Sequence, residues 1–275
     1  MPAAATPLID APALDAYAAQ FARHGLPEDG YLRLHYPRFV RTRERLHAHW
    51  DTRDGTRLLD VGAHWLHQTL LYALDGFEVT ALDLPATLEQ DGVRELARAH
   101  AIRLLPNADL ADPQALREIA DDSFDLVLFT EVIEHLAFNP VALWREIYRV
   151  MRPGARIVVT TPNYYALRSS VRRWLRALSG RGGGVRVQDI LNLKTMGHHW
   201  KEYSLRELED YFALLSPDFR CINAAHVCVA PPAAARLRGR IAGWLERAVP
   251  ALRPDLYLEV ELGAKRHGIV VEPHW

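Results

Sequence analysis

Residues 57–65 read Arg57-Leu58-Leu59-Asp60-Val61-Gly62-Ala63-His64-Trp65, and this stretch decides the fold. An apolar run that ends in a glycine predicts a buried strand, followed by a turn where backbone amides can approach a ligand. Residues 77–83 form a second apolar run, which ends in Asp83. A carboxylate at that place can accept both hydroxyl protons of a ribose. The two runs together are typical of nucleotide-binding α/β proteins.

Apolar runs alternate with helical patterns through the middle of the chain. The expected strands are 57–61, 77–83, 102–105, 124–129 and 156–161, and the expected helices are 64–75, 87–100 and 139–151. Strands this apolar, each followed by a helix, are typical of a parallel sheet covered on both faces. We therefore expect an α/β fold with a doubly wound sheet and a ligand at the carboxyl ends of its strands.

Some parts of the chain lie outside this alternation, and they indicate how the chain is divided into segments. We expect a helical N-terminal segment at 1–50 and a main domain at 51–275. Within that domain, residues 164–200 form a helical insertion, the flap, and residues 232–249 form a basic amphipathic helix. The arginines of both favour either a solvated helix face or contact with an anionic acceptor or anionic membrane.

The composition is that of an ordinary globular protein. Hydrophobic residues make up 49% of the chain, and Lys+Arg 33 against Asp+Glu 34 gives a net charge of -1. This balance argues against a protein that mainly coats nucleic acid. We expect neither a signal peptide nor a membrane span, because no basic stretch precedes an apolar one and the apolar runs are strand-sized. Cys221 and Cys228 fall on opposite faces of one expected strand, so they cannot pair, and a cytoplasmic location is expected.

The loop after the first strand departs from the dinucleotide-binding pattern. That pattern requires glycine at position 64 and glycine or alanine at position 67, where this chain has His64 and His67. A pyrophosphate needs the close backbone approach that these glycines allow, so NAD and FAD are disfavoured. An adenosyl ligand without phosphates is favoured instead.

The order of the motifs resembles that of class I S-adenosylmethionine-dependent methyltransferases. The motifs are Asp60-Val61-Gly62, Asp83, Asn107-Ala108-Asp109, the run 124–136, Arg149-Val150-Met151-Arg152-Pro153-Gly154 and Thr160-Thr161-Pro162-Asn163. The likeness covers about residues 38–230, and the block from Thr130 to Leu136 with the Arg-Pro-Gly turn is its specific part. It implies a Rossmann-like methyltransferase fold with a mostly parallel, seven-stranded sheet.

The same resemblance implies S-adenosylmethionine as the cofactor. It assigns the amino-acid end of the cofactor to Asp60 and Gly62, the ribose to Asp83 and the adenine amine to Asp109. The full set of expected cofactor-binding residues is Asp60, Gly62, Ala63, His64, Asp83, Leu84, Asp109 and Thr130. Members of the family usually carry glycine at positions 64 and 66, where this chain has His64 and Leu66.

Glu131, Glu134 and His135 follow the fourth strand at positions i, i+3 and i+4. If a helix begins there, this spacing brings all three side chains onto one face. Two carboxylates and an imidazole so close together favour a divalent cation such as Mg²⁺, Mn²⁺ or Zn²⁺. The segment 197–204, which contains His198 and His199, offers a fourth ligand.

This block, paired with a distant histidine, resembles two methyltransferase subgroups. They are the ubiquinone-pathway O-methyltransferases and the small-RNA 3′-end 2′-O-methyltransferases; in the latter such a site holds a divalent ion beside the target hydroxyl. Three roles stay open for Glu131, Glu134 and His135: metal ligands, a metal-free general base at His135, or first-turn residues of a helix.

The favoured function is methyl transfer from S-adenosylmethionine to a hydroxyl oxygen of a small, lipid-linked or sugar-linked acceptor. Glu131, Glu134 and His135 are the expected catalytic residues, and these three with His199 are the expected metal ligands. An RNA 3′-end 2′-O-methyltransferase is the first alternative, although the charge balance argues against a nucleic-acid partner. A catalytically silent assembly protein of the same fold is the second. Peripheral membrane contact is a further expectation.

Overall fold

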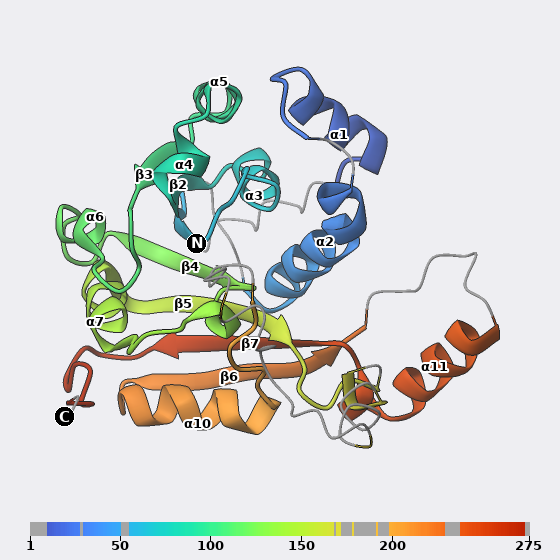
Figure 1. The fold of residues 1–275 in the computed structure, drawn as a ribbon. Coiled ribbons are helices and arrows are strands. Elements are labelled where there is room, and N and C mark those ends of the chain that lie inside the picture. The colour runs from blue at the N-terminus through green and yellow to red at the C-terminus, as the bar shows by residue number, and fades with distance from the viewer. Residues whose placement is uncertain are drawn as a thin grey trace, which may run out of the picture. The chain divides into compact units, whose positions relative to one another are not determined.

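The computed structural model describes residues 10–27, 30–50, 55–167, 169–171, 178, 191, 198–228 and 237–272 (Figure 1). Its strands are β1 (Arg57–Val61), β2 (Glu78–Asp83), β3 (Arg103–Pro106), β4 (Phe124–Thr130), β5 (Met151–Pro162), β6 (Phe219–Val227) and β7 (Asp255–Leu262). The α-helices are α1 (Leu14–Ala22), α2 (Tyr31–His49), α3 (Thr69–Leu74), α4 (Pro85–Leu88), α5 (Asp91–Ala99), α6 (Gln114–Arg117), α7 (Val141–Val150), α10 (Leu205–Leu215) and α11 (Leu237–Ala248). Two short 3-10 helices are η1 (Ile133–His135) and η2 (Pro250–Leu252).

The strands form a seven-stranded sheet in the order β3-β2-β1-β4-β5-β7-β6. β1 pairs in parallel with both β2 and β4, β2 pairs in parallel with β3, and β6 and β7 are antiparallel. The order reverses between β1 and β4, which is where a doubly wound sheet binds its ligand. The predicted Rossmann-like methyltransferase fold is confirmed.

The apolar residues of β1 and β4 are buried along the whole of each strand. Leu58, Leu59 and Val61 of β1 are buried, and so are all residues of β4 up to its last, Thr130. Burial on both faces is what a parallel sheet covered by helices requires. The near-continuous apolar runs of the sequence therefore become the centre of the core.

Two predicted helices differ from the observed ones. The helix expected at 64–75 begins only at Thr69, because His64 and Leu66 have left-handed φ values of 49° and 64°, which a right-handed helix excludes. The helix expected at 87–100 is divided into α4 and α5, with a break at Glu89 and Gln90.

The chain divides into two compact units. Unit 1 comprises Met1–Leu128 and Ala142–Arg156, and unit 2 comprises Phe129–Val141 and Ile157–Trp275. The expected cofactor-binding residues, apart from Thr130, lie in unit 1. Thr130 and the expected metal ligands lie in unit 2, so each set is described within its own unit.

In unit 1, the N-terminal helices pack beside the loop that follows β1. α1 contacts α2 and α5, and α2 contacts α3. Tyr17 of α1 is fully buried, and its hydroxyl donates to the backbone carbonyl of His67 at 2.9 Å. The predicted helical N-terminal segment thus forms part of the support of the candidate cofactor loop.

In unit 2, α10 packs on the antiparallel pair β6 and β7, as Figure 1 shows in orange and red. A reciprocal capping box starts α10: the Ser204 hydroxyl accepts from the Glu207 N–H, and the Glu207 carboxylate accepts from the Ser204 N–H. This box satisfies backbone donors that a helix start leaves unpaired. The cap fixes where α10 begins, directly after the segment that carries His198 and His199.

The two ends of the flap meet. Asn163 and Tyr203 form an isolated parallel bridge, and the Tyr164 N–H donates to the Tyr203 carbonyl at 2.9 Å. Asn163 is fully buried, and its side-chain amide donates to the carbonyls of Ala251 and Arg253. The helix that the sequence predicts within the flap lies largely outside the described residues.

Among the helices in the described part of the chain, none has the length and apolarity that crossing a membrane requires.

Candidate functional site

The loop after β1 is held against the end of β2. Gly62 has a φ of 83°, a left-handed conformation that glycine adopts without steric cost. The N–H groups of Gly62 and Ala63 both donate to the carbonyl of Leu82, at 2.9 and 3.2 Å. The loop therefore turns back over the last residues of the neighbouring parallel strand, beside Asp83.

His64 and Leu66 adopt left-handed backbone conformations although neither is glycine. Such a conformation costs an L-residue roughly 1–2 kcal/mol. Two features offset this cost: the His64 N–H donates to Oδ2 of Asp83 at 2.6 Å, and the Leu66 side chain is completely buried. The loop thus adopts, with larger side chains in place, backbone conformations that favour glycine.

Asp83 accepts hydrogen bonds on both carboxylate oxygens. Oδ2 accepts from the His64 N–H, and Oδ1 accepts from the Leu84 N–H at 2.6 Å. Each carboxylate oxygen has two lone pairs, so two further hydrogen bonds can be accepted. The half-buried side chain is therefore oriented by the backbone and still has the capacity to bind ribose hydroxyls.

Asp60 is almost fully buried at the end of β1. Its Oδ2 accepts from the Thr69 hydroxyl at 2.7 Å. Burial raises the pKa of Asp60 to about 7, because the carboxylate form loses solvation. A cationic group beside this carboxyl would favour the ionised form, which suits the ammonium of an amino-acid ligand.

Aromatic rings and imidazoles surround the His64 side chain. Its ring centroid lies 4.4 Å from that of Trp65, 5.3 Å from Tyr31 and 5.8 Å from His67. Burial lowers the pKa of His64, and burial together with His64 lowers the pKa of His67 to about 4. Both rings are therefore neutral at physiological pH and add no positive charge to the loop.

The predicted adenine-binding region follows β3. The buried Asn107 side chain donates to the Asp109 carbonyl at 2.6 Å, and one Asp109 carboxylate oxygen accepts from the Ala111 N–H at 2.8 Å. The second oxygen of Asp109 belongs to an exposed side chain. The geometry leaves this oxygen accessible to an amine donor.

The second group of predicted site residues follows β4, in unit 2. Glu131 has a left-handed φ of 56°, and residues 133–135 form the 3-10 helix η1 in place of an α-helix. The i, i+3, i+4 arrangement on one helix face is therefore not formed. Glu131 instead accepts from the Thr160 hydroxyl on Oε1 at 2.9 Å.

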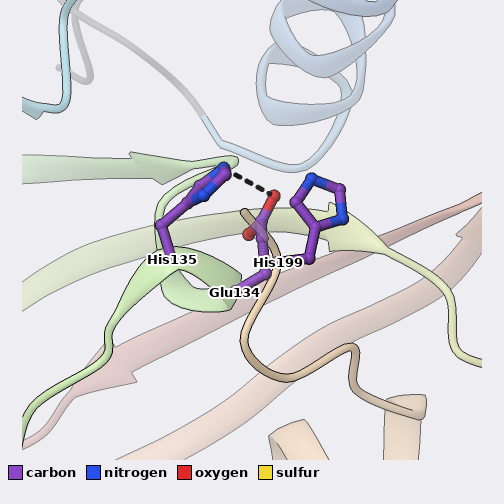
Figure 2. Close-up of side chains that lie close together, drawn as sticks. All are labelled: Glu134, His135 and His199. Atoms are coloured by element: carbon purple, nitrogen blue, oxygen red, sulfur yellow. Dashed lines mark ion pairs between the residues drawn. The ribbon is translucent and has the colours of Figure 1, made fainter. Parts of the chain in front are cut away.

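Glu134, His135 and His199 converge, and we call them the acid–histidine cluster (Figure 2). Each offers one ligand atom, and these atoms all lie within 4.8 Å of one another. Figure 2 shows the Glu134 carboxylate between the two imidazole rings. Neither Glu131 nor His198 belongs to this group among the described residues, so the structure pairs His199 with the two residues of η1.

Glu134 is a buried carboxyl with one oxygen in use. Its Oε2 accepts from the Thr161 hydroxyl at 2.8 Å, whereas its buried Oε1 has no hydrogen-bond partner in the part of the chain that the structure describes. Burial, and then the nearby Glu131, raise the pKa of Glu134 to about 8. A buried carboxylate oxygen without a donor is costly unless a proton or a cation satisfies it.

A backbone carbonyl orients the ring of His135. Nδ1 of His135 lies 3.1 Å from the His198 carbonyl, which can only accept, so Nδ1 carries the proton and donates. The lone pair is then on Nε2, which lies 3.9 Å from Oε1 of Glu134. This pattern, a ring N–H bonded to a carbonyl and a free lone pair facing a carboxylate, is common in metal-ligating histidines.

The segment that carries His199 is fastened to η1. The N–H groups of Trp200 and Lys201 donate to the Glu134 carbonyl, at 2.7 and 3.4 Å. Nδ1 of His199 lies 3.7 Å from Oε1 of Glu202, and this ion pair raises the pKa of His199. His199 is therefore placed by the backbone of the residues that follow it.

The groups that orient Glu131, Glu134 and His135 were not predicted from the sequence. Thr160 and Thr161 hold the two glutamates, and the His198 carbonyl holds His135. The two threonines end the fifth expected strand, and the two glutamates follow the fourth. The position of the threonines at the strand end was therefore the sequence signal that could have indicated this role. A backbone carbonyl leaves no signal in the side-chain pattern.

Comparison with known proteins agrees with the fold. Residues 59–159 match the family model described as "Methyltransferase domain". No curated protein sequence matches the chain.

Solved structures with a similar fold share little sequence with this chain. A Haloferax volcanii protein, described as a putative methyltransferase in complex with the Trm112 methyltransferase activator, is 17% identical, with a TM-score of 0.56 over 91% of this chain and 97% of that one. A Mesorhizobium loti S-adenosylmethionine-dependent methyltransferase is 19% identical, with a TM-score of 0.52 over 79% and 96%. A Methanosarcina mazei protein of the same description is 14% identical, with a TM-score of 0.51 over 80% and 97%. At these identities the similarity shows a common fold.

Proposed function

We propose, from the premise that this chain carries an S-adenosylmethionine-dependent methyltransferase domain, that it methylates a hydroxyl oxygen with the help of a divalent cation. The observation that supports this is the convergence of Glu134, His135 and His199, with an unsatisfied carboxylate oxygen and an imidazole lone pair among them. The acceptor in this proposal is a small, lipid-linked or sugar-linked alcohol. We also propose the organisation expected from the sequence, with a helical segment at 1–50 and the catalytic domain at 51–275.

The residues of unit 1 fit the cofactor. Asp83 has lone pairs left for two ribose hydroxyls, and its orientation is fixed by the N–H groups of His64 and Leu84. Asp60 lies buried, and the ammonium of the cofactor beside it would stabilise its carboxylate form. Gly62 and Ala63 shape the loop, and Asp109 presents an accessible oxygen to the adenine amine. Thr130, the last residue of β4, is the remaining residue that the sequence resemblance assigns to the cofactor.

The residues of unit 2 fit a divalent cation. One carboxylate oxygen and two imidazole nitrogens form a mixed donor set that suits Zn²⁺ or Mn²⁺, and Mg²⁺ less well. When bound, S-adenosylmethionine supplies an electrophilic methyl group, and a cation lowers the pKa of a hydroxyl that it coordinates. Glu134, His135 and His199 would hold the cation, with Glu131 as a neighbouring charge.

A metal-free base is the competing chemistry for the same residues. In that case Nε2 of His135, whose lone pair faces Glu134, takes the proton of the acceptor hydroxyl. A purely structural role is the third possibility that the sequence leaves open. Within the described residues Oε1 of Glu134 has no hydrogen-bond partner, and this favours the cation over both, because most buried carboxylate oxygens in folded proteins have a donor.

Metal binding tests the proposal without knowledge of the acceptor. The protein is stripped with chelator and titrated calorimetrically with Zn²⁺ and with Mn²⁺, alongside Glu134→Gln, His199→Ala and the exposed control Glu118→Gln. We expect one site in the parent and in the control, and at least tenfold weaker binding in the other two variants. Equal binding by all four proteins would exclude the site, and failure of the parent to bind either metal would favour the general base.

Cofactor binding is a separate test. Titration with S-adenosylhomocysteine should give a single site in the parent protein and in all three variants, because none of the changes is at an expected cofactor-binding residue. Absence of binding in the parent would favour the catalytically silent alternative. The two titrations can therefore fail independently.

The lipid-linked class of acceptor agrees with the peripheral membrane contact that the basic helix predicts. We propose that contact as part of the function.

A further inference from the structure

α11 presents large apolar side chains to solvent. Ile241 is 54% exposed and Trp244 is 61% exposed, and Val249, directly after the helix, is 44% exposed. Positions 241, 244 and 248 lie on one face of a helix, because they are three and seven residues apart. Gly243 and Glu246 are buried on the other side. An exposed apolar face that carries tryptophan and isoleucine is typical of a surface that binds a protein or a membrane.

The sequence around α11 is rich in arginine and poor in acids. Between positions 232 and 253 the sequence has five arginines, Arg236, Arg238, Arg240, Arg247 and Arg253, and one acid, Glu246. Glu246 is only 6% exposed and accepts from the Cys228 thiol at 3.6 Å. Arg253 is engaged with the carbonyls of Glu246 and His226. The single negative charge is thus turned inward, and Arg247 stands at the surface.

The combination of exposed tryptophan with arginine has a specific chemistry. Indole rings prefer the boundary between lipid headgroups and acyl chains, and guanidinium groups bind phosphate with two parallel hydrogen bonds. A helix with such a face lies in the plane of an anionic bilayer with its apolar side chains inserted. A second copy of the chain fits this face less well, because a symmetric contact would place the Arg247 guanidinium groups of both copies in one apolar interface.

We propose that the exposed face of α11, formed by Ile241, Trp244 and Arg247 and extended by Val249, docks on an anionic phospholipid surface. This docking deepens the proposed action on a lipid-linked acceptor. It requires neither the acid–histidine cluster nor the cofactor loop, so its test is distinct from the titrations above.

The test is co-sedimentation of the full-length protein with vesicles. One set is an equimolar mixture of phosphatidylglycerol and phosphatidylcholine, and the other is phosphatidylcholine alone. We expect binding to the first at low salt, at least tenfold weaker binding to the second, and strong weakening in 0.5 M salt. Trp244→Ala and Arg247→Glu should each weaken binding at least fivefold.

Matched controls come from α10 of the same unit. Leu214 is 70% exposed and Arg206 is exposed, so Leu214→Ala and Arg206→Glu remove an equivalent side chain or reverse an equivalent charge away from α11. Both controls should bind as the parent does. All four positions are at the surface, so circular dichroism and thermal unfolding should show unchanged folding.

Vesicles of brominated phosphatidylcholine mixed with phosphatidylglycerol show whether Trp244 is inserted into the bilayer. Their quenching of tryptophan fluorescence should be stronger in the parent than in Trp244→Phe, because the proposed depth places that indole beside the bromines. Failure of the parent to bind the anionic vesicles would overturn the proposal, and so would Trp244→Ala binding as tightly as the parent. A dimer in sedimentation velocity that Trp244→Ala dissociates would assign the face to a second copy instead.

Discussion

The backbone N–H of His64 donates to Oδ2 of Asp83 at 2.6 Å, so the loop after β1 is fastened to the end of β2 by the residue expected to bind the ribose. The carboxylate thereby has two tasks, to hold the loop and to accept from the ligand. Both tasks can be measured, one by stability and one by affinity.

Asp83→Ala should weaken binding of S-adenosylhomocysteine at least tenfold and also lower the melting temperature. The loop N–H groups lose their acceptor, and the ribose hydroxyls lose theirs. Asp83→Asn keeps one oxygen and should fall between the parent and Asp83→Ala in both measurements. Glu89→Gln, at an exposed position after α4, is the control. Unchanged affinity in Asp83→Ala would remove this residue from the cofactor site.

Leu66 allows a test of backbone strain. The difference in stability between its alanine and glycine variants should have the opposite sign to the same difference at a helical position. Leu66→Ala and Leu66→Gly both delete a fully buried side chain, at a cost of roughly 2–5 kcal/mol. Glycine should be less destabilising here than alanine, by up to about 1 kcal/mol, because the φ of 64° is strained for any residue with a Cβ.

Leu71 in α3 is the matched position, since it is equally buried in a right-handed helix. There the order should reverse, with glycine about 1 kcal/mol worse than alanine. Urea unfolding of the four variants gives the comparison. The same order at both positions would show that the left-handed conformation at Leu66 stores no strain.

Acid should destabilise unit 1 through Asp75. Its buried carboxylate is paired with Arg43 and lies 3.0 Å from Nε2 of His47. Burial raises the pKa of Asp75, but the hydrogen bonds from Arg43 and His47 outweigh burial and hold this pKa below its ordinary value. A depressed pKa gives stability that is present above the unfolded value, about 3.9, and is lost as pH falls through the folded value.

The free energy of unfolding in urea should therefore fall more steeply below pH 4 in the parent than in Asp75→Asn. Asp91→Asn, at the start of α5, serves as the comparison because it leaves this pair intact. Parallel pH profiles for the parent and Asp75→Asn would contradict the assignment.

Asp60 should couple cofactor binding to proton release. Its pKa of about 7 lies above the unfolded value of about 3.9, so ionisation opposes folding as pH rises from 4, and the penalty is complete above pH 7. The ligand ammonium favours the ionised form. Binding of S-adenosylhomocysteine at pH 6 should therefore release up to about one proton, and at pH 9 none.

Calorimetry in two buffers of different ionisation enthalpy measures this release. Asp60→Asn should bind S-adenosylhomocysteine without proton release, and Glu89→Gln should release protons as the parent does. Release that persists in Asp60→Asn would assign the proton to another group.

The sequence was sufficient for the strands of the fold because their apolar runs are nearly continuous. Leu58, Leu59 and the run through β4 are buried as a parallel sheet requires. The start of α3 was not predictable from periodicity, since the left-handed conformations of His64 and Leu66 occur at residues for which such conformations are rare.

The candidate site was predicted in its residue types and less well in its geometry. Glu134, His135 and His199 converge as expected, although through a 3-10 turn and a segment over sixty residues further along the chain. Glu131 is turned toward Thr160 by its left-handed backbone, which the i, i+3, i+4 spacing could not indicate. Spacing describes a helix face only where the helix forms.

The bridge between Asn163 and Tyr203 has a consequence for how this protein can diversify. The excursion between these residues begins and returns at one point, and His199 is attached to Glu134 through its own neighbour Trp200. A replacement of residues 166–196 should therefore leave the anchor of His199 in place, because neither the bridge nor the Trp200 hydrogen bond involves those residues. Under the proposed function, such replacements would let the acceptor change while Glu134 and His199 keep their relative positions.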